Sequence, residues 1–145
     1  MSRIASLGLV LLLASSLVAQ VLPGAGKALK PADEIRGKFE DDKDLPKMKL
    51  APANGAIADE AAFMKLWTAW KGDAAAPKID FKKQIALVGT TQCAANRVFG
   101  SFAVSETGDV KVVFGTTLIS GPGFAWVIYV VDREGIKTIN GKPIP

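Results

Sequence analysis

Residues 124–132 read Phe-Ala-Trp-Val-Ile-Tyr-Val-Val-Asp, and this stretch decides the fold. Successive side chains of a strand point to opposite faces of its sheet. One face therefore carries Phe124, Trp126, Ile128 and Val130, and the other carries Ala125, Val127, Tyr129 and Val131. Because both faces are apolar, the pattern indicates a strand that is covered on each side and lies centrally in its sheet.

The clearest helix in the sequence is residues 59–70. Four apolar residues fall at positions i, i+3, i+4 and i+7, which puts them on one continuous face: Phe63, Leu66, Trp67 and Trp70. Asp59 can cap the first turn by accepting from its free backbone N–H groups. Gly72 provides a stop. We expect this helix to cover one face of the central strand, and the other face to be covered by an N-terminal arm, by sheet curvature or by a partner.

Four further runs rich in Val, Ile and Phe indicate strands at residues 84–89, 97–104, 110–119 and 136–139. Turn-forming residues separate the later runs at 106–109, 120–123 and 133–135. Connections this short cannot hold a parallel crossover, so consecutive strands should pair antiparallel. The predicted fold class is therefore α+β, with one amphipathic helix packed on an antiparallel, meander-like sheet of about five strands.

The chain divides into three predicted parts. Residues 1–26 combine Arg3, an apolar run and a small-residue exit, which is typical of a signal peptide and predicts an exported protein, periplasmic or secreted. The alternative is an uncleaved anchor, and this segment would then be the membrane contact. Residues 27–50 are charged and broken by prolines, so we expect a flexible arm. Residues 51–145 should form a single α+β domain.

Composition excludes several classes of site. The 145 residues contain no His and one Cys, so an internal disulfide and Ser-His-Asp, Cys-His or His-zinc sites cannot form within this chain. Residues 40–44, Glu-Asp-Asp-Lys-Asp, lack the alternating Asp and the Gly of a calcium loop. We therefore expect no metal and no other cofactor. The net charge is +4 without interleaved aromatic and basic residues, so nucleic acid is not an expected partner.

Two surfaces are candidates for function. A meander places alternate turns at the same end of a sheet, so loop 90–97 should face loop 120–123. The first loop is the most polar between strands, and glycines in the second let a ligand backbone approach closely. The predicted binding residues are Thr91, Gln92, Cys93, Asn96, Arg97, Ser120, Gly121 and Gly123. The acidic turn residues should gather at the other end, where they are candidate paired carboxylates: Glu106, Asp109, Asp132 and Glu134.

Three short motifs carry a resemblance to known proteins: Phe63-Met64-Lys65-Leu66-Trp67, then Pro77-Lys78-Ile79-Asp80-Phe81, then Ile85-Ala86-Leu87-Val88. Over about residues 57–131 the chain resembles small exported bacterial domains of the protease-complex-subunit PrcB C-terminal type. That resemblance implies binding to a protease and stabilising it. Thr91-Gln92-Cys93-Ala94-Ala95 stands where that group has a "PTGGY" loop. Residues 121–124 and 135–142 also resemble the "GPGF…GVKxxNGK" ending of uncharacterised planctomycete-type secreted proteins.

The leading functional hypothesis is an exported, non-catalytic binding module with a protein partner in the envelope or outside the cell. The export signal, the missing histidines and the paired polar loops motivate it. No catalytic residue is assigned under this hypothesis. The alternatives are a small envelope enzyme that uses Cys93 or carboxylates, and a purely structural envelope protein.

Overall fold

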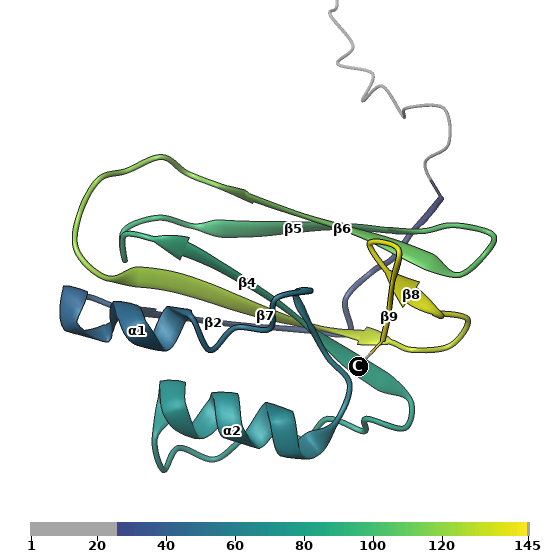
Figure 1. The fold of residues 1–145 in the computed structure, drawn as a ribbon, viewed down its shortest axis with the longest axis horizontal. Helices are drawn as coiled ribbons and strands as arrows, with labels where there is room; N and C mark the ends of the chain where they lie inside the picture. Colours follow the sequence, from purple (N-terminus) through teal and green to yellow (C-terminus); the bar gives the residue numbers. More distant parts are fainter. Residues whose placement is uncertain (1–25, 145) are drawn as a thin grey trace, which may run out of the picture.

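A computed structural model describes residues 26–144, so nearly all of the predicted signal peptide lies outside the described residues. The described chain forms two sheets, which we call the inner and the outer sheet (Figure 1). The inner sheet has the strand order β2 (Asp33–Phe39), β7 (Phe124–Asp132), β4 (Gln84–Gln92) and β3 (Ala56–Ile57). The outer sheet has the order β1 (Lys27–Ala28), β5 (Val98–Val104), β6 (Asp109–Thr116), β8 (Thr138–Ile139) and β9 (Lys142–Pro143).

The fold class is α+β, as expected, and all strand pairs of the described chain are antiparallel except β6 with β8, which is parallel. The single meander-like sheet is wrong. β7 pairs with β4 and with β2, while β5 and β6 form a hairpin in the other sheet. The chain changes sheets after β4 and returns after β6. The physical reason lies in β7: one helix covers one of its faces, and the outer sheet is the layer that buries Val127, Tyr129 and Val131 on the other.

The predicted helix is confirmed as α2 (Glu60–Lys71), with its N-cap at Asp59 and its C-cap at Gly72. The Asp59 carboxylate accepts from the Ala62 N–H at 2.8 Å. All four residues of the predicted apolar face are buried. They pack on the inner-sheet face that carries Trp126 and Ile128, so α2, the inner sheet and the outer sheet are three successive layers (Figure 1). Within residues 26–144 no helix has the length and apolar character to cross a membrane.

The expectation of a flexible arm at residues 27–50 is wrong, because this segment is part of the folded domain. β2 pairs with β7 through all seven of its residues. Ile35 and Phe39 pack against the cluster under α2. The charged residues between them sit on an edge strand, where charge discourages pairing with other chains. A 3-10 turn (Asp42–Asp44) and the short helix α1 (Leu45–Met48) follow, and the Lys47 carbonyl accepts from the Trp70 indole N–H at 2.9 Å.

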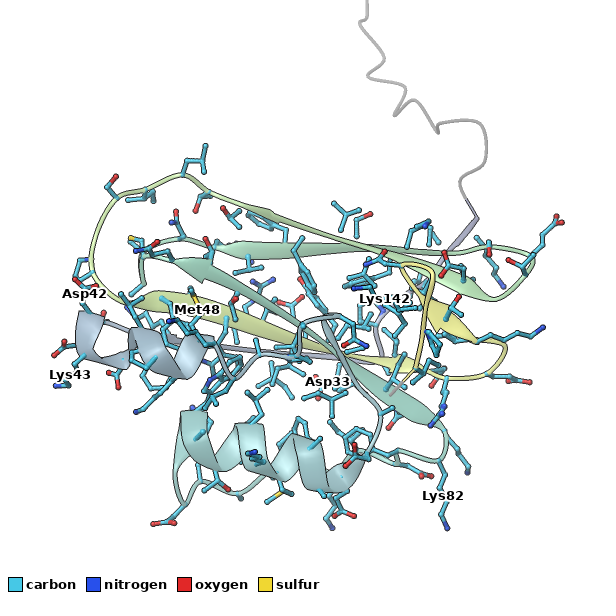
Figure 2. The ribbon with its side chains drawn as sticks, in the orientation of Figure 1. Asp33, Asp42, Lys43, Met48, Lys82 and Lys142 are labelled. Atoms are coloured by element: carbon cyan, nitrogen blue, oxygen red, sulfur yellow. The ribbon has the colours of Figure 1, made fainter. Side chains whose placement is uncertain are left out.

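Two of the remaining strands end away from their predicted positions. β4 continues to Gln92 beyond the predicted end at residue 89, so Thr91 and Gln92 pair with β7 and belong to a strand and not to a loop. The run 110–119 was expected to be a strand throughout, but β6 ends at Thr116. Residues 117–123 therefore form a connection from the outer sheet back to the inner sheet, at the end of the molecule where Asp42 and Lys43 lie (Figure 2). Leu118 and Ile119 belong to this connection and not to a sheet.

Candidate functional site

The two predicted loops do lie together. The Cys93 N–H donates to the Gly123 carbonyl at 2.7 Å, and the Ala94 N–H donates to the Pro122 carbonyl at 2.9 Å. The prediction was right although its reasoning was not, because these loops are the two crossings between the sheets. Antiparallel pairing places the end of β4 beside the start of β7. The β5–β6 hairpin is connected to both strands at this end of the inner sheet.

Asn96 is the residue that holds the two loops in place. Its side chain is 9% exposed and makes four hydrogen bonds. The Nδ2 group donates to the carbonyls of Gln92 and Ile119, at 2.7 and 3.0 Å. The Oδ1 atom accepts from the Thr117 hydroxyl at 3.0 Å and from the Ile119 N–H at 2.7 Å. Two donors and two lone pairs are all that an amide side chain has, so Asn96 positions the loops and has no group left for a ligand.

Gly123 and Cys93 are also occupied by the fold. Gly123 has φ +74°, and a Cβ there would lie 1.8 Å from the Phe39 carbonyl oxygen. Its N–H donates to an Asp42 carboxylate oxygen at 2.7 Å. Cys93 is 3% exposed, and its Sγ lies 3.0 Å from the position of a Cβ on Gly121. The Gly123 backbone and the Cys93 thiol are therefore both buried where the two loops meet.

The other predicted residues are accessible. Gln92, Arg97, Ser120 and Gly121 are exposed, and Thr91 is half-buried. The Arg97 guanidinium lies over the Phe99 ring, 5.5 Å from its centroid, which is within the range of a cation–π contact. These side chains form the polar part of the surface at this end.

Sequence reasoning missed the exposed apolar side chains of the hairpin and of the connection that follows it. Leu118 is 97% exposed and Ile119 is 51% exposed, while Phe99 and Val113 are 44% and 63% exposed. Phe99 and Val113 lie diagonally across the β5–β6 ladder on one face, because Phe99 pairs with Gly115 and Ser101 pairs with Val113. We call these four residues the hairpin patch. The position of the turn signal, which begins only at Ser120, had placed Leu118 and Ile119 inside a strand.

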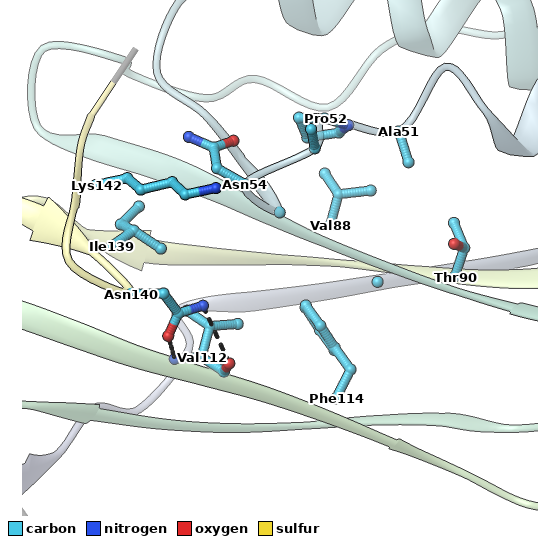
Figure 3. Close-up of a pocket in the computed structure, with 13 residues that line it drawn as sticks. Ala51, Pro52, Asn54, Val88, Thr90, Val112, Phe114, Ile139, Asn140 and Lys142 are labelled. Atoms are coloured by element: carbon cyan, nitrogen blue, oxygen red, sulfur yellow. Dashed lines mark hydrogen bonds between the residues drawn. The ribbon is translucent and has the colours of Figure 1, made fainter.

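A groove lies between β4, residues 51–55 and the outer sheet at β6 and β8 (Figure 3). Its volume is about 350 Å³. Asn140 stands on its floor, where its side chain bonds both backbone groups of Val112, with Lys142 and Asn54 near one end of the groove and Thr90 toward the other (Figure 3). Gly89 has no side chain here, which leaves room for the Phe114 ring. The sequence contained no signal for this groove, because its walls come from four separate segments.

The acidic turns meet at the opposite end, as expected: the Lys137 N–H donates to the Gly108 carbonyl at 2.8 Å. Asp109 accepts at 2.7 Å from both the Thr138 hydroxyl and the Gly141 N–H, and it pairs with Lys111 at 3.2 Å. These contacts, with the Thr138 bond the strongest, hold the pKa of Asp109 below its usual range. Glu106, Asp132 and Glu134 are exposed. Among residues 26–144 no three His, Cys, Asp or Glu side chains come close enough to hold a metal ion.

No protein-family model, curated protein or solved structure matches this chain.

Proposed function

We propose that this protein is a non-catalytic binding module that recognises another protein through the hairpin patch. The observation that carries the proposal is that Leu118 is 97% exposed while the neighbouring backbone is fixed by Asn96, whose side chain has all of its hydrogen bonds made. Here the amide holds both backbone groups of Ile119 and so presents two apolar side chains in a fixed arrangement.

The surroundings of the hairpin patch support a protein partner. Apolar side chains that gather at one site and are rimmed by polar ones mark interaction surfaces. The rim here consists of Arg97, Gln92 and Ser120, all exposed. Arginine over an aromatic ring is a frequent contact group at protein interfaces, and a fixed loop loses little conformational freedom on binding. The predicted export would place this partner in the envelope or outside the cell.

The test is site-specific photo-crosslinking in the producing cell. A photoreactive residue at Leu118 should capture a discrete partner, and the same residue at Glu106, in a turn at the opposite end, should not. Leu118→Asp should reduce recovery of that partner at least tenfold while urea melts stay unchanged, because the Leu118 side chain is 97% exposed. Ile119→Asp should reduce recovery as much, with a small loss of stability because Ile119 is about half buried. Equal capture from Leu118 and Glu106, or recovery unaffected by both aspartates, would refute the proposal.

An enzyme that uses Cys93 makes a different prediction. The thiol is buried under Gly121, so alkylation of the native protein at pH 6–7 should be at least a hundredfold slower than alkylation in urea. Rapid alkylation of the folded protein below pH 7 would favour the enzyme hypothesis over the binding module.

A further inference from the structure

β6 has a backbone edge that the rest of the described chain closes only in part. On an antiparallel strand, alternate residues direct their N–H and C=O groups to opposite sides. Even-numbered residues of β5 bond away from β6: the Gly100 N–H donates to the Tyr129 hydroxyl at 3.1 Å, and the Phe102 carbonyl accepts from the Leu29 N–H at 3.0 Å. Their partners on β6 must therefore point away from β5 as well, and these are Val110, Val112, Phe114 and Thr116.

The first half of this edge is satisfied. The Val110 carbonyl accepts from the Asn140 N–H at 2.8 Å. The Val112 N–H donates to Asn140 Oδ1 at 3.0 Å, and the Val112 carbonyl accepts from Asn140 Nδ2 at 3.3 Å. The side-chain amide of Asn140 thus bonds Val112 as the backbone of a neighbouring strand would. Beyond it, the outward backbone groups of Phe114 and Thr116 have no hydrogen-bond partner within residues 26–144.

The open half of the edge borders the groove of Figure 3, which Val112, Phe114 and Asn140 line on this side. Lys142 is the one charged residue among the described residues that line it. Lys142 takes part in none of the ion pairs of the described chain. The groove therefore holds the open backbone groups of Phe114 and a cation that no carboxylate of residues 26–144 balances, and the open groups of Thr116 follow on the same edge.

We infer that an extended segment of a partner polypeptide adds to β6 as a further strand, pairs with Phe114 and Thr116, and places an acidic side chain against Lys142. Strand residues rise about 3.3 Å each, so pairing with Phe114 and Thr116 needs a segment of at least about three residues, roughly 7 Å from its first Cα to its last. In this mode the main-chain bonds supply affinity and the side-chain contacts supply specificity. The inference does not rest on the hairpin patch, whose contacts come from other side chains.

The probe is a phage-displayed library of random heptapeptides selected on the folded protein. Selected peptides should be enriched in Asp or Glu. Their binding should slow hydrogen exchange of the Phe114 and Thr116 amides at least tenfold, as measured by NMR. Leu118→Asp should bind these peptides as the wild type does, which separates this inference from the proposed function.

Two pairs of variants sharpen the test. Thr116→Pro removes the outward N–H without breaking the β5–β6 ladder, and it should weaken binding at least tenfold. Thr116→Val is its matched control, since it loses the same hydroxyl and keeps the N–H, and it should bind within twofold of the wild type. Lys142→Glu should weaken binding at least tenfold, and Lys30→Glu, an equal charge change beside β1, should not.

Several results would overturn the inference. Failure of any peptide to be enriched over the unselected library is one. Selected peptides that leave exchange at Phe114 and Thr116 unchanged are another, and equal binding to Lys142→Glu and Lys30→Glu is a third. If Thr116→Pro does not fold, the exchange measurement and the lysine pair decide the question by themselves.

Discussion

The two edges of the β5–β6 hairpin differ in how the fold treats their backbone groups. On the β5 side, side chains from the inner sheet reach across: Arg36 donates to the Val98 carbonyl at 2.5 Å, and the Tyr129 hydroxyl accepts from the Gly100 N–H at 3.1 Å. On the β6 side, Asn140 closes the edge at Val112, and Phe114 and Thr116 stay open. One hairpin thus has an edge used for joining the sheets and an edge left available.

The comparison indicates which side-chain hydrogen bonds should contribute most to the free energy of unfolding. A backbone group that is buried must find a partner, because leaving it unpaired costs its full desolvation. A group beside a groove can be hydrated and loses little when its partner is removed. We therefore expect the cost of deleting a bridging side chain to follow the burial of the groups that it leaves behind.

The largest effect is expected at Asn96, which lies just before β5 and bonds the residues that follow β6. Asn96→Ala removes four hydrogen bonds and leaves the Gln92 and Ile119 carbonyls without their donors. We expect a loss of about 2–4 kcal/mol in the free energy of unfolding, measured by urea melts. Asn54→Ala is the matched control, because Asn54 makes one bond of this kind, to the Ala56 N–H, and should cost about 1 kcal/mol. Equal losses for the two variants would show that the four bonds of Asn96 contribute no more to stability than the single bond of Asn54.

Next in size is the closed edge itself. Tyr129 is 5% exposed, and Tyr129→Phe deletes the hydroxyl that accepts from Gly100 and from Arg36 while keeping the ring. The Gly100 N–H is then left facing the inner sheet without an acceptor. We expect a loss of about 1–3 kcal/mol, with faster hydrogen exchange at Gly100 than at Phe102 or Ser101. No change in stability would mean that water replaces the hydroxyl and that this edge is not closed after all.

The open edge should respond less. Asn140 has φ +50°, so Asn140→Gly tolerates the backbone conformation and removes only the side chain that bonds Val112. We expect a loss of about 1 kcal/mol, part of it from the greater freedom of glycine in the unfolded chain. The variant should also leave the outward backbone groups of Val112 without a partner, so peptides that add to this edge should bind more tightly. A loss as large as that of Tyr129→Phe would contradict the contrast between the edges.

The elements were predictable from the sequence to the extent that their signals are local. Periodicity placed α2, and apolar runs between turn residues placed β4 to β7. β2 was missed because its charges and Pro46 beyond it suggested an arm, although Ile35 and Phe39 alternate as an edge strand requires. The two-sheet arrangement depends on which strands pair, and consecutive strands with short turns favour a meander over a crossing between sheets.

Of the candidate site, only the meeting of the two loops could be predicted from the sequence. The polarity of residues 91–97 and the glycines of 121–123 located the two crossings correctly, but polarity cannot tell a side chain that binds a ligand from one that binds its own loop. Asn96 is such a case, since all of its bonds are internal. The open edge of β6 had no sequence signal. It exists because Asn140, distant along the chain, bonds the backbone of Val112 and does not reach Phe114 or Thr116.

The smallest effect expected is a pH dependence at the foot of β6, where β8 joins it. The Thr138 hydroxyl, the Gly141 N–H and Lys111 hold the pKa of Asp109 below its usual range of about 4. Because the folded state favours the carboxylate, this contribution to stability is present at neutral pH and is lost as the pH falls below about 4. Asp109→Asn keeps an oxygen that can accept from Thr138 and Gly141 but does not titrate. Urea melts between pH 7 and pH 3 should therefore show a shallower acid loss for Asp109→Asn than for the wild type. Parallel pH profiles would mean that β8 is held by its strand pairing alone and that the charge on Asp109 does not help to close this end of the edge.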